Sequence, residues 1–517
     1  MVSKPGPRLL VVAGTRTVTE GFLTSGDIAW RDGASQSRAA AGGRLTLQHA
    51  NRYSGEVDFE RISRELMNRL LFHSTNGQAP PVDLREALLK GQAPDRGLYL
   101  PQRLPQLTPA EITALGQRTY PEIAFDVLRR FAAGVVDDGT LSAFCREAYN
   151  FEVPLEPVYD RVHVMRLDRG PTASFKDFAA RMMARLIGRF VGETGRSLTI
   201  LTATSGDTGS AVASAFHGVA GIRVLVLFPM AEVSDRQRKQ MTTLRNNIRA
   251  IAVDGKFDAC QALVKRAFAD ATLAAIPLSS ANSINIGRLL PQTVYYFYAA
   301  SRLARPGEPL VISVPSGNFG DMMGAVIAGQ MGLPIRRLVV PVNGNDEFPR
   351  FLTNGSYQKI EPSLNCLSNA MNVGHPSNLA RLVAVYGGQL DETGKLHRRP
   401  DLERMRRELF STAVSDELTR ATIRQAWQER RLLLEPHGAV GWRGFLDFIE
   451  AEPLGDSPAV VLETAHPAKF PDEIERLLGF SPEVPPSLAA LDKLTEDYDR
   501  LPVDYEQFKQ YLIKNYA

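Results

Sequence analysis

The stretch LTILTATSGDTGSAVASAF, residues 198–216, decides the fold class of this chain. Residues 198–204 are a short apolar run, and the glycine-rich turn at 205–209 leads from this run into a helical segment. A buried strand that passes through a glycine turn into a helix is the building unit of parallel α/β sheets. The stretch therefore predicts an α/β fold.

The same pattern recurs along the chain, which supports this prediction. Short runs rich in Val, Ile and Leu, bounded by Gly, Pro or Asn, predict strands at 198–204, 223–229, 248–254, 310–315, 337–342 and 459–464. Apolar strands separated by helices of about 10 to 20 residues indicate a parallel sheet that is covered on both faces. We expect the glycine turns after two of these strands to lie in one sheet.

Changes of pattern divide the chain into regions. Helical spacing starts at Asp58 and recurs at 82–89, 108–116 and 120–133, whereas residues 32–44 are rich in Gly, Ala and Ser and have no apolar period. The predicted division is 1–45, an extension or linker; 46–155, a mainly helical N-terminal region; 156–305, a smaller mobile α/β domain; 306–480, a larger α/β region; and 481–517, a C-terminal helical tail.

The composition is that of a soluble globular protein. Of 517 residues, 44% are hydrophobic and 23% are charged, and 60 Lys and Arg against 57 Asp and Glu leave a net charge of +3. A net charge this close to zero does not indicate binding to nucleic acid or to an anionic membrane. No apolar run reaches the roughly 18 to 20 residues that span a bilayer, and the three cysteines form no C-x-x-C motif. We expect a cytoplasmic protein without a metal site.

Two glycine-rich turns are candidate anion sites, at 205–209 and 316–321. Glycine lets backbone N–H groups crowd toward a ligand, and the free amides of a helix N-terminus add partial positive charge. Each turn taken alone has a plainer explanation, because turns between strands and helices often contain glycine for geometry. Together they suggest two anions, or one ligand with two anionic ends.

A third feature is GPTASFKD, residues 170–177, which places Lys176 at the start of an amphipathic segment. An amine in an apolar, anion-lined pocket can carry an aldehyde cofactor as a Schiff base. A lysine at a helix start is more often a solvated surface charge, so the hypothesis depends on the combination with the two turns.

The combination resembles the threonine synthases, which are pyridoxal-phosphate enzymes of fold type II, the tryptophan-synthase-β-like fold. The resemblance runs from about Phe72 to the C-terminus and is closer to the longer, bacterial and fungal type. The blocks that carry it include GQAPDRGLYLP (91–101), GPTASFKDF (170–178), LTATSGDTGSA (201–211), SSANSINIGRLLPQ (279–292), SVPSGNFGD (313–321), SNAMNVGHPSN (368–378), EPHGAV (435–440) and TAHPAKF (464–470).

The resemblance implies a role for each matching residue. Lys176 would be the Schiff-base lysine and general base, Asp207 would lie near the ring 3-oxygen, and Thr464 would face the pyridine nitrogen. The residues implied to hold the cofactor phosphate are Gly317, Asn318, Phe319, Gly320 and Asp321. The residues implied to bind the substrate carboxylate are Thr204, Ser205 and Thr208. Those implied to bind the substrate phosphate or to line the site are Asn282, Ser283, Asn285 and Arg288. For these four residues, an equal alternative is that they form a helix N-terminal cap and a surface charge.

The implied reaction converts O-phospho-L-homoserine and water to L-threonine and phosphate, in a monomer or homodimer whose smaller domain closes as a lid. The sequence departs from the family pattern at Asn76, at Asp168 and Arg169, at 230–232 and at Asn372, mostly by losing basic or histidine character. If these positions line the pocket, the alternative is a related lyase or replacement enzyme for another activated or phosphorylated amino acid. A catalytically silent scaffold is a further alternative.

Overall fold

The computed structural model describes residues 9–11, 19–24, 27–31 and 69–517, which fall into two units, 1–61 and 62–517. In the first unit, β1 (Leu9–Val11), β2 (Thr19–Thr24) and β3 (Asp27–Arg31) form an antiparallel sheet in that order. The linker prediction for 1–45 did not include these strands. The helix predicted from Asp58 lies outside the described residues up to position 68.

The second unit begins with the mainly helical region that the sequence predicts. Its elements are β4 (Phe72–Ser74), α2 (Leu84–Lys90), β5 (Tyr99–Pro101), α3 (Pro109–Ala114), α4 (Tyr120–Ala132) and α5 (Asp138–Ala148). Local signals place the helix starts: Thr108 caps α3 by accepting from the Glu111 amide, and a proline follows it at the first helical position. The three helices predicted at 82–89, 108–116 and 120–133 are confirmed.

Five parallel strands form a smaller sheet, in the order β11-β8-β9-β10-β18. The strands are β8 (Leu198–Ala203), β9 (Ile222–Pro229), β10 (Ile248–Val253), β11 (Leu278–Ser280) and β18 (Asp499–Leu501). The helices around them are α6 (Lys176–Thr194), α7 (Asp207–Phe216), α8 (Asp235–Thr242), α9 (Phe257–Ala269) and α19 (Tyr505–Tyr516).

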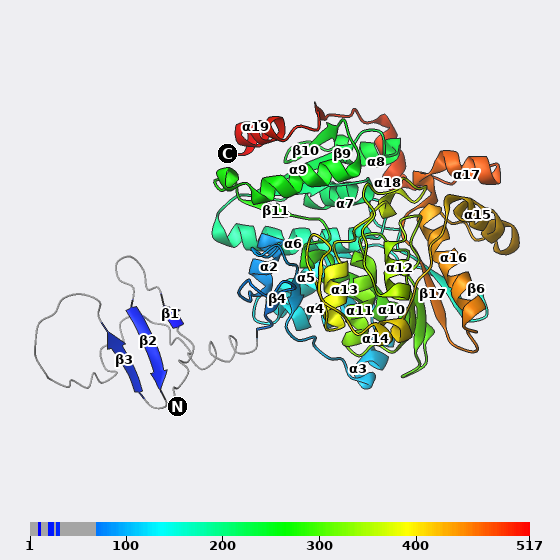
Figure 1. Cartoon of the computed structure of the whole chain (residues 1–517), viewed down its shortest axis with the longest axis horizontal. Helices are drawn as coiled ribbons and strands as arrows, with labels where there is room; N and C mark the ends of the chain where they lie inside the picture. Colours follow the sequence, from blue (N-terminus) through cyan, green and yellow to red (C-terminus); the bar gives the residue numbers. More distant parts are fainter. Residues whose placement is uncertain (1–8, 12–18, 25–26, 32–68) are drawn as a thin grey trace, which may run out of the picture. The chain divides into compact units, whose positions relative to one another are not determined.

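Both faces of the smaller sheet are covered, as the apolar strands predict. Leu201 belongs to the apolar cluster that α9 and α19 form on one face, whereas its neighbour Ile200 belongs to the cluster of α6 and α7 on the other. This alternation follows from the two-residue period of a strand. In Figure 1, α9 and α19 lie beside β9 and β10, at the upper edge of the second unit.

Six strands form the larger sheet, in the order β16-β13-β12-β17-β7-β6, parallel except for the edge pair of β6 and β7. They are β6 (Leu155–Tyr159), β7 (Val162–Arg166), β12 (Leu310–Ser313), β13 (Ile335–Val339), β16 (Leu409–Phe410) and β17 (Ala459–Glu463). Val461 packs with α15 and α16 on one face, and Val460 belongs to the cluster of α10 and α11 on the other. Every residue of β12 and β17 is buried.

The remaining elements surround the larger sheet and complete the tail. They are α10 (Thr293–Leu303), α11 (Gly320–Gln330), α12 (Glu347–Asn354), α13 (Leu379–Val385), the hairpin β14 (Gln389–Leu390) and β15 (Leu396–Arg398), α14 (Leu402–Glu408), α15 (Asp416–Arg430), α16 (Pro436–Ala451), α17 (Pro471–Leu478) and α18 (Pro486–Ala489).

Two sequence expectations need correction. The strands belong to two sheets rather than one, so the glycine turns at 205–209 and 316–321 leave from different sheets. Sheet membership also crosses the predicted boundaries at 156 and 481, because β7 pairs with β17 in the larger sheet and β18 of the tail pairs with β10. Pairing between strands far apart in the chain leaves no local signal, so pattern changes could not reveal it.

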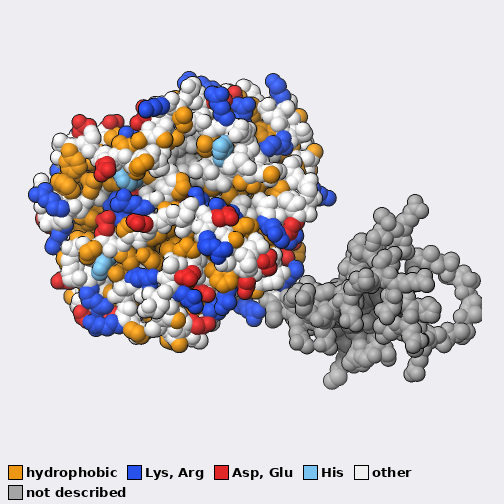
Figure 2. Space-filling model, turned by 180° about the vertical axis from the view of Figure 1, so that it is seen from behind, with side chains coloured by type: hydrophobic (Ala, Val, Ile, Leu, Met, Phe, Trp, Pro, Cys, Tyr) orange, Lys and Arg blue, Asp and Glu red, His pale blue; other side chains and the backbone are white. Residues whose placement is uncertain are grey.

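Among the described residues, no helix is both long and apolar enough to span a bilayer. On the face shown in Figure 2, Lys and Arg side chains are interspersed with Asp and Glu side chains over the described surface. Charge on this face is therefore mixed rather than gathered by sign.

Candidate active site

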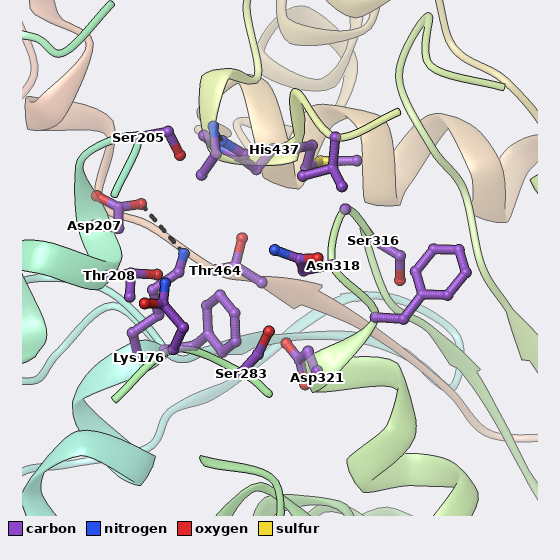
Figure 3. A pocket seen from close by; sticks show the side chains of 18 of the residues that line it. Lys176, Ser205, Asp207, Thr208, Ser283, Ser316, Asn318, Asp321, His437 and Thr464 are labelled. Atoms are coloured by element: carbon purple, nitrogen blue, oxygen red, sulfur yellow. Dashed lines mark hydrogen bonds and ion pairs between the residues drawn. The ribbon is translucent and has the colours of Figure 1, made fainter. Parts of the chain in front are cut away.

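One cavity brings together all three motifs of the sequence analysis (Figure 3). Lys176 lies at the start of α6, the turn at 205–209 follows β8, the turn at 316–321 follows β12, and Thr464 follows β17. The lining consists of Phe175, Lys176, Ala203, Thr204, Ser205, Asp207, Thr208, Phe257, Asn282, Ser283, Arg288, Gln292, Pro315, Ser316, Gly317, Asn318, Phe319, Gly320, Asp321, Ala370, Met371, Val373, His437 and Thr464.

The loop before α6 is built to present Lys176. Asp177 accepts from the Thr172 amide at 2.8 Å and from the Thr172 hydroxyl at 2.7 Å, which closes the turn. A Cβ on Gly170 would come within 2.4 Å of the Asp177 Oδ2, so only glycine leaves room for this carboxylate. Phe175 then donates its amide to the Thr464 carbonyl at 2.9 Å. Backbone contacts therefore set the start of α6 beside Thr464.

The Lys176 amine is buried beside one carboxylate. Its Nζ lies 3.8 Å from Asp207 Oδ2, and only 12% of the side chain is exposed. Burial lowers the pKa of Lys176, Asp207 opposes this change, and the cations of Lys469 and Arg288 lower the pKa further. A lysine in this setting gives up its proton more easily than one on the surface, which favours nucleophilic and base chemistry.

The turn after β8 is closed by Thr204. Its Oγ1 accepts from the Gly206 amide at 2.9 Å and from the Gly209 amide at 2.8 Å. Gly206 has φ of 129°, and a Cβ there would meet the Gln237 side chain at 2.5 Å. Ser205 and Thr208 lie on the cavity wall beside the turn. The Thr204 hydroxyl is thus engaged as an acceptor in holding the turn.

Asp207 is the first residue of α7 and connects several elements. Its Oδ1 accepts from Lys469 Nζ at 2.7 Å and from Gln237 Nε2 at 3.0 Å. Burial alone would raise the pKa of Asp207, but the cations of Lys469 and Lys176 hold it well below its ordinary range. The carboxylate is therefore ionised.

The turn after β12 offers backbone donors to the cavity. Phe319 adopts φ of 63° before α11 begins at Gly320, and a Cβ on Gly317 would come within 2.7 Å of Met371 Cα. Asn318 holds the turn in place by accepting from the Ser377 amide at 3.0 Å through its side chain. Within residues 69–517, the amides of Gly317, Asn318 and Phe319 donate to no protein acceptor. They are free to bind an anion.

The Asp321 side chain does not extend this set of donors. Its Oδ1 accepts from the hydroxyls of Tyr295 and Tyr296, and its Oδ2 is buried without a partner. Burial raises the pKa of Asp321 to about 6, although both tyrosine hydroxyls and Lys176 oppose the shift. A carboxylate would repel a phosphate, so any phosphate contact by this residue must come from its backbone.

The segment after β11 contributes further polar groups, with one exception. Asn282 donates to the Ala203 carbonyl at 2.7 Å, and Ser283 lies near Asp321 on the cavity wall. Arg288 is buried, donates to the Ala281 carbonyl at 2.6 Å and keeps its Nε without a partner. Asn285 is not among the lining residues. Its side-chain oxygen accepts from the Gly287 amide and so caps the next 3₁₀ turn, and its side-chain nitrogen donates to the Leu88 and Ser280 carbonyls.

Two residues of the site have no role in the sequence analysis, although both lie in its quoted blocks. His437 lines the cavity, accepts from the Ala370 amide through Nε2 at 3.1 Å and contacts Glu435 through Nδ1. This pair of contacts fixes the orientation of the imidazole ring. Lys469 is buried against Asp207. Their partners are distant in the chain, so spacing could not reveal them.

The cavity fits a ligand with an aldehyde and a phosphate. Free amides at 317–319 and the unpartnered Nε of buried Arg288 are donors, which suits anions, and the Lys176 amine suits an aldehyde. The Thr464 hydroxyl points into the space between them in Figure 3. Pyridoxal phosphate carries both functional groups, and the residues present fit it.

Family models cover nearly all of the second unit. Residues 148–464 match the model described as pyridoxal-phosphate dependent enzyme, residues 71–149 the threonine synthase N terminus, and residues 438–512 the threonine synthase C-terminal model. The chain is similar to threonine synthase of Serratia marcescens, at 39% identity over 84% of this chain and 96% of the relative. It is also similar to that of Escherichia coli, at 37% identity over 84% and 97%.

Solved structures agree with these matches. A threonine synthase from Brucella melitensis with bound pyridoxal phosphate superposes with a TM-score of 0.79 at 36% identity, covering 87% of this chain and all of that one. The yeast threonine synthase superposes with a TM-score of 0.77 at 28% identity, covering 86% and 99%. The fold type II architecture expected from the sequence is therefore confirmed.

Proposed function

The chain belongs to the threonine synthase family of pyridoxal-phosphate-dependent lyases, and on this premise we propose how its residues convert O-phospho-L-homoserine and water to L-threonine and phosphate. The observation that carries the proposal is the convergence of Lys176, the turn at 316–321 and Thr464 on one cavity. A scaffold that had lost catalysis would have no need to keep these three together.

We propose that the amides of the turn at 316–321 hold the cofactor phosphate, that Lys176 carries the cofactor, and that Thr464 faces its ring nitrogen. Bound pyridoxal phosphate supplies an electron sink for the electron pair left when a proton leaves the substrate. The chain supplies the proton transfers: the Lys176 Nζ takes the Cα proton and moves a proton at Cβ. Its buried, cation-flanked position supports this role.

The substrate lies between two groups of donors in this proposal. Ser205 and Thr208 bind its carboxylate beside the turn at 205–209, and Arg288 with Ser283 binds its phosphate on the other side. Thr204 contributes by holding the turn, since its hydroxyl oxygen already accepts two amides. Phosphate leaves from Cγ and water adds at Cβ, so the site must exclude other water during the reaction.

Closure of the smaller domain would provide that exclusion. Hydrogen bonds join it to the loop between α12 and α13. Asp258 accepts from the Ser363 amide at 3.3 Å and from the Ser363 hydroxyl at 2.9 Å, and Asn369 donates to the Glu232 carbonyl at 3.3 Å and to the Gln237 side chain at 3.2 Å. Hydrogen bonds of this kind can form and break. We propose that they accompany closure of the smaller domain over bound substrate.

The positions at which the sequence departs from the family pattern lie outside the cavity, which favours O-phosphohomoserine over another substrate. Asn76, Asp168, Arg169 and residues 230–232 are all described, and none lines the cavity. Asp168 instead pairs with Arg166 at 2.8 Å in the core, and Glu232 caps α9 through the Phe257 amide. Lost basic character at these places does not remove a cation from the site.

Steady-state kinetics with purified holoenzyme tests the proposal. We expect phosphate release and threonine formation from O-phospho-L-homoserine at a kcat/KM far above that for O-acetyl-homoserine, O-succinyl-homoserine or O-phosphoserine. Lys176→Ala should show neither turnover nor a borohydride-reducible link to the cofactor, whereas Lys493→Ala, at an exposed lysine, should keep both. A higher kcat/KM for any competitor would contradict the substrate assignment.

We also propose that the enzyme acts on its small-molecule substrate in the cytoplasm, as a monomer or homodimer. The near-neutral net charge of +3 and mixed surface charge support a partner other than nucleic acid or membrane. Light scattering after size-exclusion chromatography measures the oligomeric state, and a mass above two chains would contradict it.

A further inference from the structure

A second buried lysine stands behind the cavity wall. Lys469 ends the 3₁₀ turn at Pro467–Lys469, and its side chain is 0% exposed. Its Nζ lies 2.7 Å from Asp207 Oδ1, and among the described residues Asp207 is the only carboxylate within 4 Å of it. Lys176 reaches the other oxygen of the same carboxylate, at 3.8 Å.

The contact between Lys469 and Asp207 is held from both sides. The Lys469 amide donates to the His466 carbonyl at 2.9 Å, and Arg236 donates to the Ala468 carbonyl, which ties the turn to α8. Gln237, also on α8, donates to Asp207 Oδ1 at 3.0 Å. Because Lys469 is enclosed, its ammonium cannot turn to water and depends on Asp207.

Two lysine side chains therefore approach one carboxylate, at unequal distances. A hydrogen-bonded pair at 2.7 Å in a buried site is a much stronger interaction than an approach at 3.8 Å, which exceeds hydrogen-bond distance. Asp207 therefore interacts more strongly with Lys469 than with Lys176. The other charged groups that act on Lys176 are Arg288, which opposes its protonation, and Asp321, which favours it.

We propose that Lys469 is a positioning residue that holds the Asp207 carboxylate for itself and so leaves the Lys176 amine in its neutral, nucleophilic form. The inference rests on the proposed role of Lys176, because only an unprotonated amine has the lone pair that attacks an aldehyde carbon. It explains why the site keeps two lysines where one would carry the cofactor. Lys469 itself does not line the cavity.

The test measures protonation of Lys176 directly in the full chain after removal of the cofactor, with the fold checked by circular dichroism. Trace acetic anhydride labels amines across a pH series, and mass spectrometry quantifies the Lys176 peptide relative to that of exposed Lys493. In Lys469→Met, loss of the cation frees Asp207 to pair with Lys176. We expect Lys176 labelling at pH 7 to fall at least about tenfold, equivalent to one unit of pKa.

Two further variants make the result specific. In Lys469→Arg, which keeps the charge, Lys176 should be labelled at nearly the wild-type rate. In Asp207→Asn, labelling of Lys176 should increase, because the carboxylate that favours a proton on Lys176 is gone. If Lys469→Met does not fold, Lys469→Gln keeps a donor to Asp207 without the charge and should behave as described for Met. Unchanged Lys176 labelling in the charge-removing variants that fold would overturn the proposal.

A separate readout distinguishes this proposal from the proposed function. Borohydride reduction of the wild-type holoenzyme should add the mass of reduced cofactor to the Lys176 peptide. If the adduct forms on another residue, the role of Lys176 is wrong. If it forms on Lys176 while labelling is insensitive to Lys469, only the inference about Lys469 is wrong.

Discussion

The Phe175 amide donates to the Thr464 carbonyl at 2.9 Å, so the residue before Lys176 is bonded to the residue proposed to face the cofactor ring. The neighbouring bridge between Ser174 and Ala465 extends this pairing, and the His466 amide returns a bond to the Ala173 carbonyl at 3.1 Å. Main-chain hydrogen bonds therefore join the two segments without the Thr464 side chain. Side-chain changes at Thr464 should therefore leave Lys176 in place.

Thr464→Val tests the chemistry of this position apart from its geometry. Valine has the same shape but no hydroxyl, so the contact to the ring nitrogen is lost while the phosphate turn is untouched. We expect bound cofactor, measured by visible absorbance, to stay near one per chain and kcat to fall about tenfold or more, at least about 1.4 kcal/mol. Thr353→Val, at an exposed threonine of α12, should leave both unchanged. Wild-type kcat in Thr464→Val would place the hydroxyl outside the chemistry.

Gly317→Ala tests whether the backbone of the turn at 316–321 grips the cofactor phosphate. The new Cβ would lie 2.7 Å from Met371 Cα, a backbone atom, so the turn must move and its amides lose their common direction. We expect cofactor affinity, measured by titration of the stripped enzyme, to weaken about tenfold or more. Gly192→Ala is the matched control, because its Cβ meets nothing within 4 Å. Equal affinities in the two variants would count against a phosphate site here.

Sequence patterns indicate the conformation of the site wherever one local segment determines the geometry. The apolar runs, the two glycine turns and the GPTASFKD loop each specify their own conformation, and Asp177 closes its turn with Thr172 only five positions away. Family resemblance then assigned roles that spacing alone could not. The structure brings Thr204, Lys176 and Thr464 together on one cavity, although they come from segments far apart in the chain.

Other features depend on contacts that leave no local pattern. The pair of Lys469 and Asp207 joins residues 262 positions apart, and β18 enters the smaller sheet from the tail. For Asn285, the sequence left open a substrate contact or a helix cap, and in the structure its side chain caps the turn at 286–288. Polar residues in such blocks can act on the ligand or on the backbone, and only their partners distinguish the two.

Arg381 is predicted to position the substrate side of the cavity from a distance. Its guanidinium is fully buried without a carboxylate partner within the described residues; it donates to the Tyr99 carbonyl at 2.9 Å, Ser283 carbonyl at 3.0 Å and Ile284 carbonyl at 2.6 Å, and to the Asn378 side chain. Arg381→Met leaves these carbonyls unpaired, which should lower the free energy of unfolding by roughly 2–4 kcal/mol. Because Ser283 loses its support, we expect KM to rise more than kcat falls.

Arg381→Lys separates the charge from the shape of the guanidinium. Lysine keeps a buried cation but cannot reach carbonyls on three segments at once, so it should rescue little of the stability or of KM. Urea denaturation and steady-state kinetics measure the two effects. Full rescue by lysine would show that charge, rather than the array of donors, holds this region.

Glu347 makes stability depend on pH in a direction opposite to most carboxylates. It begins α12, is 1% exposed and leaves its Oε2 without a partner, and burial raises its pKa to about 8. The folded state therefore holds a proton that the unfolded state releases near pH 4.5, so this residue lowers stability progressively from about pH 4.5 to pH 8. Below about pH 4.5 the ionisation of Glu347 does not change the free energy of unfolding, and above about pH 8 its destabilising effect is fully present.

Glu347→Gln should remove this dependence, because an amide does not ionise. We expect its free energy of unfolding, relative to wild type, to rise between pH 5 and pH 8 by roughly 2–4 kcal/mol, since each pKa unit corresponds to about 1.4 kcal/mol. The new amide N–H group adds a cost of about 1–2 kcal/mol at every pH where it lacks an acceptor, which shifts the whole difference without changing its slope. Glu417→Gln, at an exposed position of α15, is the matched control and should show a flat difference. Urea denaturation at several pH values measures both, and a flat difference for Glu347→Gln as well would mean that Glu347 is ionised in the folded protein.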